Sequence, residues 1–317
     1  MPIITDPKII KRWTSFYGKS LVNSFQYLNK SGISSIIRIN YLKSSDEIVI
    51  PELERKGFVL EKLSLPGAYK VVKHRISLGA THEFLLGYYA IQGLSSQYVS
   101  HIVNPNPADN VLDMSAAPGG KTAHLSTLMN NKGLIVAIDS SKNRMTALRS
   151  NLARLGVSNV LAFQGDAIRV TPELGSFDKV LLDAPCSGSG SICKRPEKEW
   201  TKDESDIERL ALKQTNLLNI GLKYLKVGGE LTFSTCSLEP EEGELQIIDI
   251  LEKYGQKISV LDITHQTDIF NPVILQNYKK NIELLHKNQI KWLRMTPNDN
   301  YEGFFICKIQ KNSELNN

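Results

Sequence analysis

Short apolar runs recur along the second half of the chain at intervals typical of a layered α/β protein. Five runs predict strands, at residues 111–116, 134–139, 160–166, 179–185 and 230–237. The first four are separated by amphipathic stretches or tight loops, and in one of these Met145, Leu148, Leu152 and Leu155 form a single helical stripe. Runs buried on both faces and alternating with helices predict a doubly wound, mostly parallel, Rossmann-like sheet.

The first quarter of the chain has a different pattern. Residues 33–43 alternate and are β-branched, the two serines that follow can cap a short helix, and another apolar run occupies residues 58–63. We therefore expect a small α+β unit over residues 1–75. Aromatic and aliphatic residues at helical spacing from Thr81 onward predict a connecting helix within residues 76–107. The α/β domain then spans residues 108–312, and a polar tail spans residues 313–317.

Composition places the chain among globular proteins. It has 317 residues, 41% of them hydrophobic and 22% charged, which excludes disordered, collagen-like and membrane classes. No apolar run approaches the roughly 18 residues of a membrane span, and the N-terminus has no signal-peptide pattern. We expect a cytoplasmic protein whose four cysteines are reduced.

Charge is divided unevenly. Residues 1–75 contain 13 Lys and Arg against six Asp and Glu, a balance of +7, whereas the remainder has a balance of −2. This asymmetry fits a basic appendage that contacts a polyanion, beside a near-neutral body with another role. A solvated basic face without a partner is the alternative.

The turn after the first predicted strand, DMSAAPGGKT at residues 113–122, predicts a nucleoside site. Its end resembles a phosphate-binding P-loop, but Ser115 occupies the position of the first glycine, which argues against a nucleotide triphosphatase. Asp113, the pair Gly119 and Gly120, and a following helix N-terminus remain. Backbone amides can approach a ligand at such a pair, and the helix end favours a carboxylate, as in an amino-acid-bearing nucleoside.

Two more acids follow successive strands. Asp139 is placed to hold two ribose hydroxyls, and Asp166 is within reach of an adenine amino group. Each alone could be a strand-end or helix-capping residue. Together with Asp113 they favour S-adenosylmethionine as cofactor, with a dinucleotide as the weaker alternative. Arg144 could meet the cofactor's carboxylate or a neighbouring acid, or form a surface ion pair.

Asp183 and Cys186 follow the fourth predicted strand, and Cys236 lies at the end of the fifth. Free cysteines are commonly small buried hydrophobes, but these two stand in Ser/Gly/Pro-rich loops, where a thiolate can act as a nucleophile. A metal site is disfavoured because the spacing from Cys186 to Cys193 has no matching histidines.

A methyl donor beside a thiol and a carboxylate suggests methylation of cytosine. Carbon 5 of cytosine is a poor nucleophile. If a thiolate adds to carbon 6 while an acid protonates or hydrogen-bonds N3, carbon 5 becomes an enamine carbon that can attack a sulfonium methyl group.

These motifs resemble the Nol/Nop/Sun family of S-adenosylmethionine-dependent RNA cytosine-C5 methyltransferases. DMSAAPGGKT, DAPCSGSG and STCSLEPEE are close to the family's three signature motifs, and RINYLK, EFLLGYYAIQGLSS and RMTPNDNYEGFF also resemble family segments. The likeness runs over residues 38–305. It implies a Rossmann-like methyltransferase fold and a small N-terminal unit that contacts RNA.

The resemblance also implies roles for single residues. Cys236 is the nucleophile, Cys186 helps to release the methylated RNA, Asp183 hydrogen-bonds the cytosine edge, and Lys121 lies between the cofactor loop and the catalytic pocket. The residues implied to line the cofactor site are Ala116, Ala117, Pro118, Gly119, Gly120, Lys121, Asp139, Arg144, Asp166 and Asp183.

Two stretches depart from the family pattern, RPEKEW at residues 195–200 and the Asn/Lys-rich segment at residues 264–291. We expect tRNA as the substrate, with rRNA as the alternative, and no membrane or metal partner. An RNA-binding assembly factor without turnover is a further alternative, against which the two cysteines, Asp183 and the intact cofactor loop argue.

Overall fold

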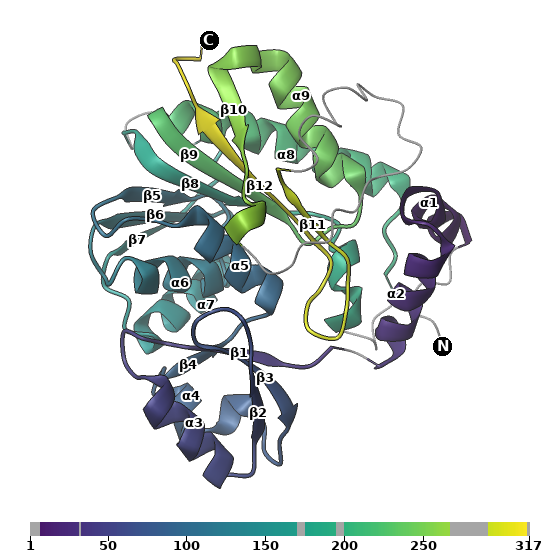
Figure 1. Ribbon diagram of the computed structural model, residues 1–317. Helices are drawn as coiled ribbons and strands as arrows, with labels where there is room; N and C mark the ends of the chain where they lie inside the picture. Colours follow the sequence, from purple (N-terminus) through teal and green to yellow (C-terminus); the bar gives the residue numbers. More distant parts are fainter. Residues whose placement is uncertain (1–6, 32, 170–174, 195–199, 267–290, 316–317) are drawn as a thin grey trace. The chain divides into compact units, whose positions relative to one another are not determined.

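The structure of the protein, a computed structural model, falls into two compact units (Figure 1). It describes residues 7–31, 33–169, 175–194, 200–266 and 291–315. The first unit comprises residues 1–33, 184–219 and 233–317, and the second comprises residues 34–183 and 220–232. Most of both stretches that depart from the family pattern, residues 195–199 and 267–290, lies outside the described residues.

The second unit contains the predicted parallel strands. β5 (Asn110–Asp113) pairs in parallel with β6 (Leu134–Asp139) and with β8 (Phe177–Asp183), and β6 pairs in parallel with β7 (Val160–Gln164). Along the whole sheet the strand order is β10-β12-β9-β8-β5-β6-β7. Five of the six residues of β6 are buried, as expected for a parallel strand covered on both faces. The α/β fold with a mainly parallel sheet is confirmed.

Two helices follow the first two of these strands. α6 (Gly120–Leu128) begins at the end of the cofactor loop, and α7 (Lys142–Arg154) begins after Ser141, whose hydroxyl accepts a hydrogen bond from the Arg144 amide at 3.4 Å. The predicted stripe on α7 is buried and packs with Ala123 of α6 and Ala137 of β6. The helical spacing of that stripe therefore identified the packed face of α7.

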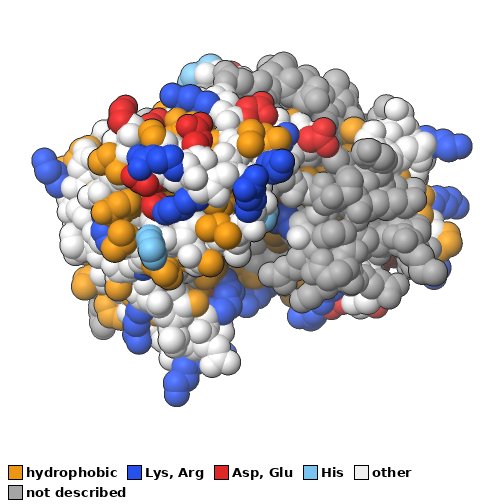
Figure 2. Space-filling model, turned by 90° about the horizontal axis from the view of Figure 1, so that it is seen from below, with side chains coloured by type: hydrophobic (Ala, Val, Ile, Leu, Met, Phe, Trp, Pro, Cys, Tyr) orange, Lys and Arg blue, Asp and Glu red, His pale blue; other side chains and the backbone are white. Residues whose placement is uncertain are grey.

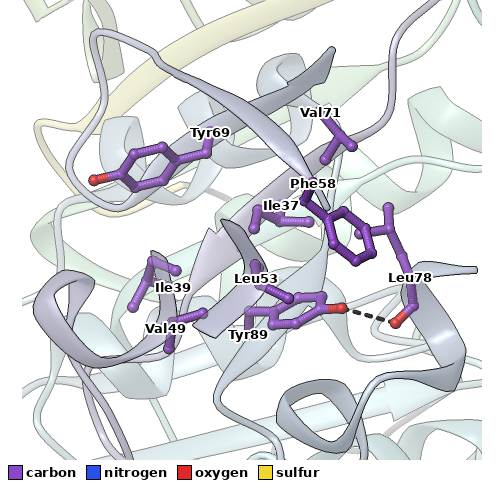
Figure 3. Close-up of a cluster of buried hydrophobic side chains, with 9 residues drawn as sticks. All are labelled: Ile37, Ile39, Val49, Leu53, Phe58, Tyr69, Val71, Leu78 and Tyr89. Atoms are coloured by element: carbon purple, nitrogen blue, oxygen red, sulfur yellow. Dashed lines mark hydrogen bonds between the residues drawn. The ribbon is translucent and has the colours of Figure 1, made fainter. Parts of the chain in front are cut away.

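A small antiparallel sheet, ordered β2-β3-β1-β4, also belongs to the second unit. Its strands are β1 (Ile36–Ile39), β2 (Val59–Lys62), β3 (Ala68–Lys73) and β4 (Tyr89–Ile91). Val49 and Leu53 of α3 (Asp46–Arg55) pack with Ile37, Tyr69 and Tyr89 of the sheet (Figure 3). The predicted strand, helix and strand are present, with β3 and β4 in addition.

The continuous connecting helix predicted from Thr81 is wrong. The segment contains α4 (His82–Leu85), then β4, then α5 (Leu94–Val103). Gly87 interrupts the helix with a positive φ of 76°, and a Cβ there would collide with the carbonyl oxygen of Arg154. Pairing of β4 with β1 overrides the helical spacing of the apolar residues.

The first unit combines helices with antiparallel strands. Its elements, with two that continue into the second unit, are α1 (Pro7–Tyr17), α2 (Lys19–Ser31), η3 (Ser189–Lys194), α8 (Glu204–Tyr224), β9 (Leu225–Thr235), η4 (Pro240–Glu242), α9 (Glu244–Tyr254), η5 (Gly255–Lys257), β10 (Ile258–Leu261), η6 (Thr264–Gln266), β11 (Leu293–Met295) and β12 (Phe304–Lys311). β12 pairs antiparallel with both β10 and β11.

The compact units differ from the expected boundaries at residues 75 and 107. Residues 1–33 belong to the first unit, because α1 buries an apolar face there. Trp13 and Phe16 of α1 pack in one cluster with Ile192 and Leu238. The basic first quarter of the sequence is therefore divided between two units.

Candidate active site

The cofactor loop, residues 113–122, joins β5 to α6 in the second unit. Asp113 is 1% exposed and accepts a hydrogen bond from the Thr122 hydroxyl at 2.8 Å. Burial raises the pKa of Asp113 to about 7, although the Thr122 hydrogen bond opposes the shift. Asp113 therefore fixes the two ends of the loop to each other.

The glycine pair gives the loop its shape. Gly119 has a positive φ of 98°, which favours glycine, and a Cβ there would approach the Leu148 side chain to 2.7 Å. A Cβ at Gly120 would meet no atom within 4 Å. The loop thus packs closely against α7 at Gly119 and faces open space at Gly120.

Asp139 links the cofactor loop to the end of β6. Its carboxylate is 3% exposed and accepts hydrogen bonds from the amides of Ala117 at 3.1 Å and Ser141 at 3.0 Å. Arg144 Nη2 lies 3.4 Å from the same carboxylate and also donates to the Ala117 carbonyl. Arg144 therefore pairs with a neighbouring acid, one of the alternatives that its position allowed.

Lys121 and Asp183 form a second ion pair in this unit. Lys121 Nζ lies 2.6 Å from Asp183 Oδ2, with side-chain exposures of 14% and 29%. Lys121 is in the first turn of α6 and Asp183 is the last residue of β8. A partly exposed charged pair thus occupies the carboxyl end of the sheet.

Asp166 is not brought into these contacts. Among the described residues its carboxylate accepts the Ile168 amide at 3.1 Å and lies 3.9 Å from Arg169 Nε. Its side chain is 41% exposed. It remains an accessible carboxylate two residues beyond the end of β7.

The first unit brings Cys186 and Cys236 together. Their sulfur atoms lie 3.3 Å apart, both residues are half-buried, and neither is in a disulfide. The amide of Ala184 donates to the Ser234 carbonyl at 2.8 Å, which sets the two segments side by side. The other two cysteines, Cys193 and Cys307, are buried, and burial raises the pKa of the Cys193 thiol to about 11.

Backbone hydrogen bonds hold the loops after these cysteines. The Gly190 amide donates to the Cys236 carbonyl at 3.0 Å, and the Gly303 amide donates to the Gly190 carbonyl at 2.8 Å. A Cβ at Gly190 would collide with the Gly303 carbonyl oxygen. The approach of the two backbones therefore requires glycine at residue 190.

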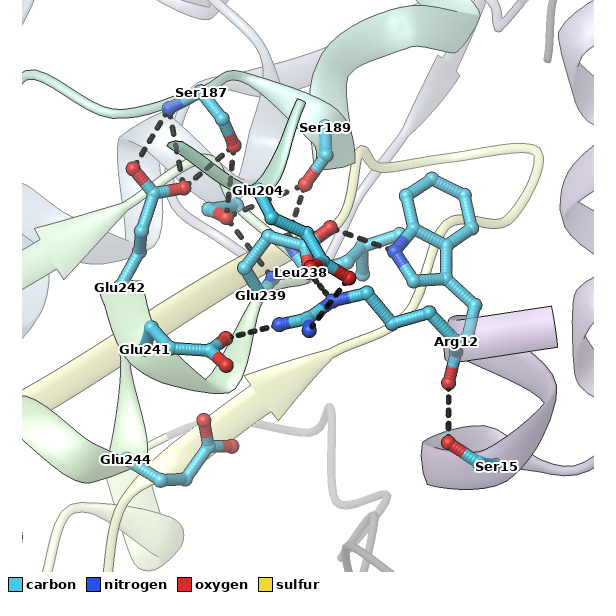
Figure 4. Close-up of polar contacts among 12 residues, drawn as sticks. Arg12, Ser15, Ser187, Ser189, Glu204, Leu238, Glu239, Glu241, Glu242 and Glu244 are labelled. Carbon is cyan, nitrogen blue, oxygen red and sulfur yellow. Dashed lines mark hydrogen bonds and ion pairs between the residues drawn. The ribbon is translucent and has the colours of Figure 1, made fainter. Parts of the chain in front are cut away.

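Helix α1 is hydrogen-bonded to the loop after Cys236 (Figure 4). Arg12 Nε lies 2.9 Å and Trp13 Nε1 lies 2.7 Å from the Glu239 carboxylate, which is fully buried. Arg12 also pairs with Glu241 at 2.5 Å, and the Tyr17 hydroxyl donates to the Leu238 carbonyl. Burial alone would lower the pKa of Arg12, but the two glutamates raise it. Arg12, one of the cations of the basic N-terminal stretch, therefore holds this loop.

Four buried polar residues near the cysteines were missed by the sequence analysis: Ser187, Gln214, Ser237 and Glu242. Their side chains contact one another or the loop backbone. Ser187, Ser237 and Glu242 lie within the quoted motifs DAPCSGSG and STCSLEPEE, but the acids of EPEEGE taken alone resemble a solvated surface.

A family model described as 16S rRNA methyltransferase RsmB/F matches residues 100–310, more than half of the chain. The chain belongs to this family. The resemblance to Nol/Nop/Sun proteins is thereby confirmed.

Two curated relatives illustrate the range of the family. A 28S rRNA (cytosine-C(5))-methyltransferase of Mus musculus is 34% identical over 282 residues, which cover 87% of this chain and 35% of the relative. A tRNA (cytosine(72)-C(5))-methyltransferase of Pyrococcus horikoshii is 38% identical over 241 residues, covering 75% of this chain and 56% of that protein. The chain spans less than two thirds of the length of either relative.

Solved structures match nearly the whole chain. A methyltransferase homologue from Pyrococcus horikoshii superposes with a TM-score of 0.82 at 33% identity, covering 98% of this chain and 96% of that one. NSun6 from the same organism, solved with SFG, an analogue of S-adenosylmethionine, gives a TM-score of 0.83 at 25% identity and covers 98% and 99%.

Within the described ranges, no helix is both long and apolar enough to cross a membrane. The same residues contain no group of three or more His, Cys, Asp or Glu side chains placed to hold a metal ion.

Proposed function

We propose that the protein transfers a methyl group from S-adenosylmethionine to carbon 5 of a cytosine in RNA. The observation that carries the proposal is the cysteine pair, with sulfur atoms 3.3 Å apart in a chain of this family. Cys236 directly follows β9, and Cys186 follows the end of β8 by three residues. Both are half-buried, unlike the buried Cys193 and Cys307. Partial exposure suits a nucleophile better than a packing residue.

The second unit fits the cofactor. Open space in front of Gly120 allows a ligand to approach the backbone, and the N-terminus of α6 favours a carboxylate. Asp139 accepts hydrogen bonds from the ribose hydroxyls of the nucleoside, and Asp166 accepts one from its adenine amino group. Arg144 holds the Asp139 carboxylate in place through their ion pair. The similar NSun6 structure, solved with an analogue of S-adenosylmethionine, supports this choice of cofactor. When bound, S-adenosylmethionine supplies an electrophilic methyl group.

Cys236 acts on the cytosine ring. Its thiolate forms a bond to carbon 6, and the electron pair of the C5–C6 double bond becomes available at carbon 5. After methylation, the proton leaves carbon 5, the C5–C6 double bond forms again, and the sulfur departs with its electron pair. Cys186 assists this release. Asp183 hydrogen-bonds the cytosine edge, and Lys121, 2.6 Å away, orients its carboxylate.

The RNA substrate is proposed to be tRNA. Of the two relatives described above, the tRNA enzyme has the higher identity, 38% against 34%. rRNA is the second candidate, because the family model and the mouse relative are named for rRNA.

The small sheet of the second unit is proposed to contact RNA. Lys73 and Arg75 are exposed beside Val72 and Ile76, which are 56% and 43% exposed. The described part of the face in Figure 2 shows Lys and Arg side chains next to hydrophobic ones. A shallow pocket of about 410 Å³, lined in part by Arg75 and Ile76, opens here. Basic groups beside apolar surface suit phosphates and unstacked bases.

Covalent trapping tests the proposal. We expect wild-type protein to transfer label from the cofactor to cytosines of bulk tRNA. Cys186→Ala should accumulate a denaturation-resistant complex with RNA, because release is impaired after the bond to Cys236 has formed. Cys236→Ala should form no complex and lose turnover by several orders of magnitude.

Trapping that persists in Cys236→Ala would overturn the assignment of the nucleophile. Label that enters rRNA and not tRNA would replace the substrate and leave the chemistry intact. If the protein binds the cofactor but labels neither tRNA nor rRNA, the proposed activity is refuted.

A further inference from the structure

A fully buried carboxylate, Glu242, contacts the segment that carries Cys186 (Figure 4). Its two oxygens lie 2.9 and 3.1 Å from the Ser187 amide nitrogen, and the Ser187 hydroxyl donates to Oε2 at 2.5 Å. Gln214 Nε2 donates to Oε1 at 3.1 Å. Because Ser187 directly follows Cys186, the carboxylate holds this segment through both backbone and side chain.

The backbone of Glu242 contacts the other cysteine segment. Its carbonyl accepts a hydrogen bond from the Thr235 hydroxyl at 2.9 Å, and Thr235 directly precedes Cys236. The hydroxyls of Ser187 and Ser237, the residues after each cysteine, lie 3.2 Å apart. One residue therefore contacts a chain neighbour of each cysteine.

The charge of Glu242 is held by neutral donors. Across the described part of the chain it forms no ion pair, whereas its neighbours do: Arg12 pairs with Glu239 and Glu241, and Arg294 pairs with Glu244. Hydrogen bonds to a carboxylate are short and directional, and a buried carboxylate that is deprived of a donor is costly. These donors therefore restrict the position of Ser187 closely.

We propose that Glu242 is a positioning residue that holds Cys186 against Cys236 for release of the methylated RNA, an inference that rests on the proposed function. In that step the C5–H bond breaks and its proton passes to the Cys186 thiolate. The electron pair of that bond forms the C5–C6 double bond, and the bond from carbon 6 to Cys236 breaks with both electrons on sulfur. Glu242 takes no proton; it fixes the sulfur that does.

Glutamine should replace Glu242 well. In Glu242→Gln the amide oxygen can take the place of Oε1 and accept from the Ser187 amide and from Gln214 Nε2. The amide nitrogen can then donate to the Ser187 hydroxyl oxygen, and Gln214 keeps its hydrogen bond to the Pro185 carbonyl. Glu242→Ala removes all of the carboxylate's hydrogen bonds.

The experiment compares Glu242→Ala, Glu242→Gln and the exposed helix α8 control Glu208→Ala, all with both cysteines present. We expect Glu242→Ala to accumulate the covalent RNA complex, with turnover lowered about 10- to 100-fold. A displacement of a reacting group by about 1 Å lowers the reaction rate roughly 100-fold. Glu242→Gln should restore release, and Glu208→Ala should match wild type. A merely structural role would lower turnover without accumulating the complex.

Wild-type turnover in folded Glu242→Ala, or reduced turnover without the complex, overturns the proposal. If Glu242→Ala does not fold, Ser187→Ala replaces it, since that variant removes the hydroxyl and keeps the amide hydrogen bonds. Wild-type release by Ser187→Ala is equally decisive against the proposal. Cys186→Ala is measured in parallel. If it traps RNA and Glu242→Ala does not, only this inference fails; if Cys186→Ala does not trap RNA, the proposed function fails.

Discussion

Arg38 is a buried arginine whose described partners are neutral. It is 1% exposed, and its guanidinium donates to Gln92 at 2.8 Å and to Thr127 at 3.5 Å. Burial lowers the pKa of Arg38 to about 9. The rings of His101 and His124 stack edge to face nearby, with centroids 4.9 Å apart. A buried positive charge beside two histidines disfavours their protonation.

These histidines predict a decrease of stability in acid. Burial, and then Arg38, lowers the pKa of His101 to about 4, and the pKa of His124 lies well below its ordinary value. Between about pH 6.5 and 4 the unfolded chain binds protons that the folded chain does not, so the free energy of unfolding falls as pH falls. Replacing His101 with Phe should reduce that fall by about 2 kcal/mol.

Urea denaturation at pH 7 and pH 4.5 measures the effect. His265→Gln, at an exposed histidine, should retain the wild-type difference between the two pH values. If the difference in the free energy of unfolding between the two pH values is unchanged in His101→Phe, other groups cause the loss of stability in acid.

Among the elements, α1 connects the N-terminal residues to the loop after Cys236. We predict that Trp13→Phe lowers the free energy of unfolding by about 1–3 kcal/mol, because the buried Glu239 carboxylate is deprived of a donor at 2.7 Å. Turnover should fall as well, since the loop adjoins Cys236. Chemical denaturation and methylation assays measure both, and Lys11→Ala, at an exposed position of the same helix, is the control. If Trp13→Phe is as stable as the wild type, the hydrogen bond from Trp13 to Glu239 does not stabilise the fold.

Strands and strand-end residues were predictable, and long-range hydrogen bonds were not. The runs that became β5, β6 and β8 are short and apolar and form mostly buried strands, with Asp139 and Asp183 at strand ends. β7 was also predicted as a strand, but its Leu161 and Phe163 are exposed, so its burial on both faces was predicted wrongly. The break at Gly87 depends on a backbone 67 residues away, at Arg154. Burial of Glu242 depends on Ser187 and Gln214, whose approach no local pattern encodes.

For the whole molecule, the structure changes the meaning of the +7 balance of residues 1–75. Several of those charges are already engaged. Arg12 pairs with glutamates, Arg38 is buried, Lys43 donates to the Arg154 carbonyl and Lys56 pairs with Glu83. Exposed cations such as Lys73 and Arg75 therefore become the better candidates for phosphate contacts.

We predict that RNA affinity falls steeply with salt. Lys73→Glu with Arg75→Glu should weaken binding and reduce the slope of log affinity against log salt by about one for each phosphate that is no longer neutralised. Filter binding between about 50 and 200 mM salt, a range in which phosphate contacts change affinity by orders of magnitude, gives the slope. Lys213→Glu, exposed on α8, should leave the slope unchanged. A flat dependence in the wild type would argue against an electrostatic interface.

The backbone bonds from Gly190 to Cys236 and to Gly303 have a consequence for divergence within the family. Because main-chain atoms alone make these two hydrogen bonds, the bonds do not depend on which side chains stand at residues outside the Glu242 contacts. Gly190 itself cannot accept a Cβ. Substitutions on the surrounding surface can therefore change RNA preference while these backbone bonds and the Glu242 contacts keep the two thiols in place.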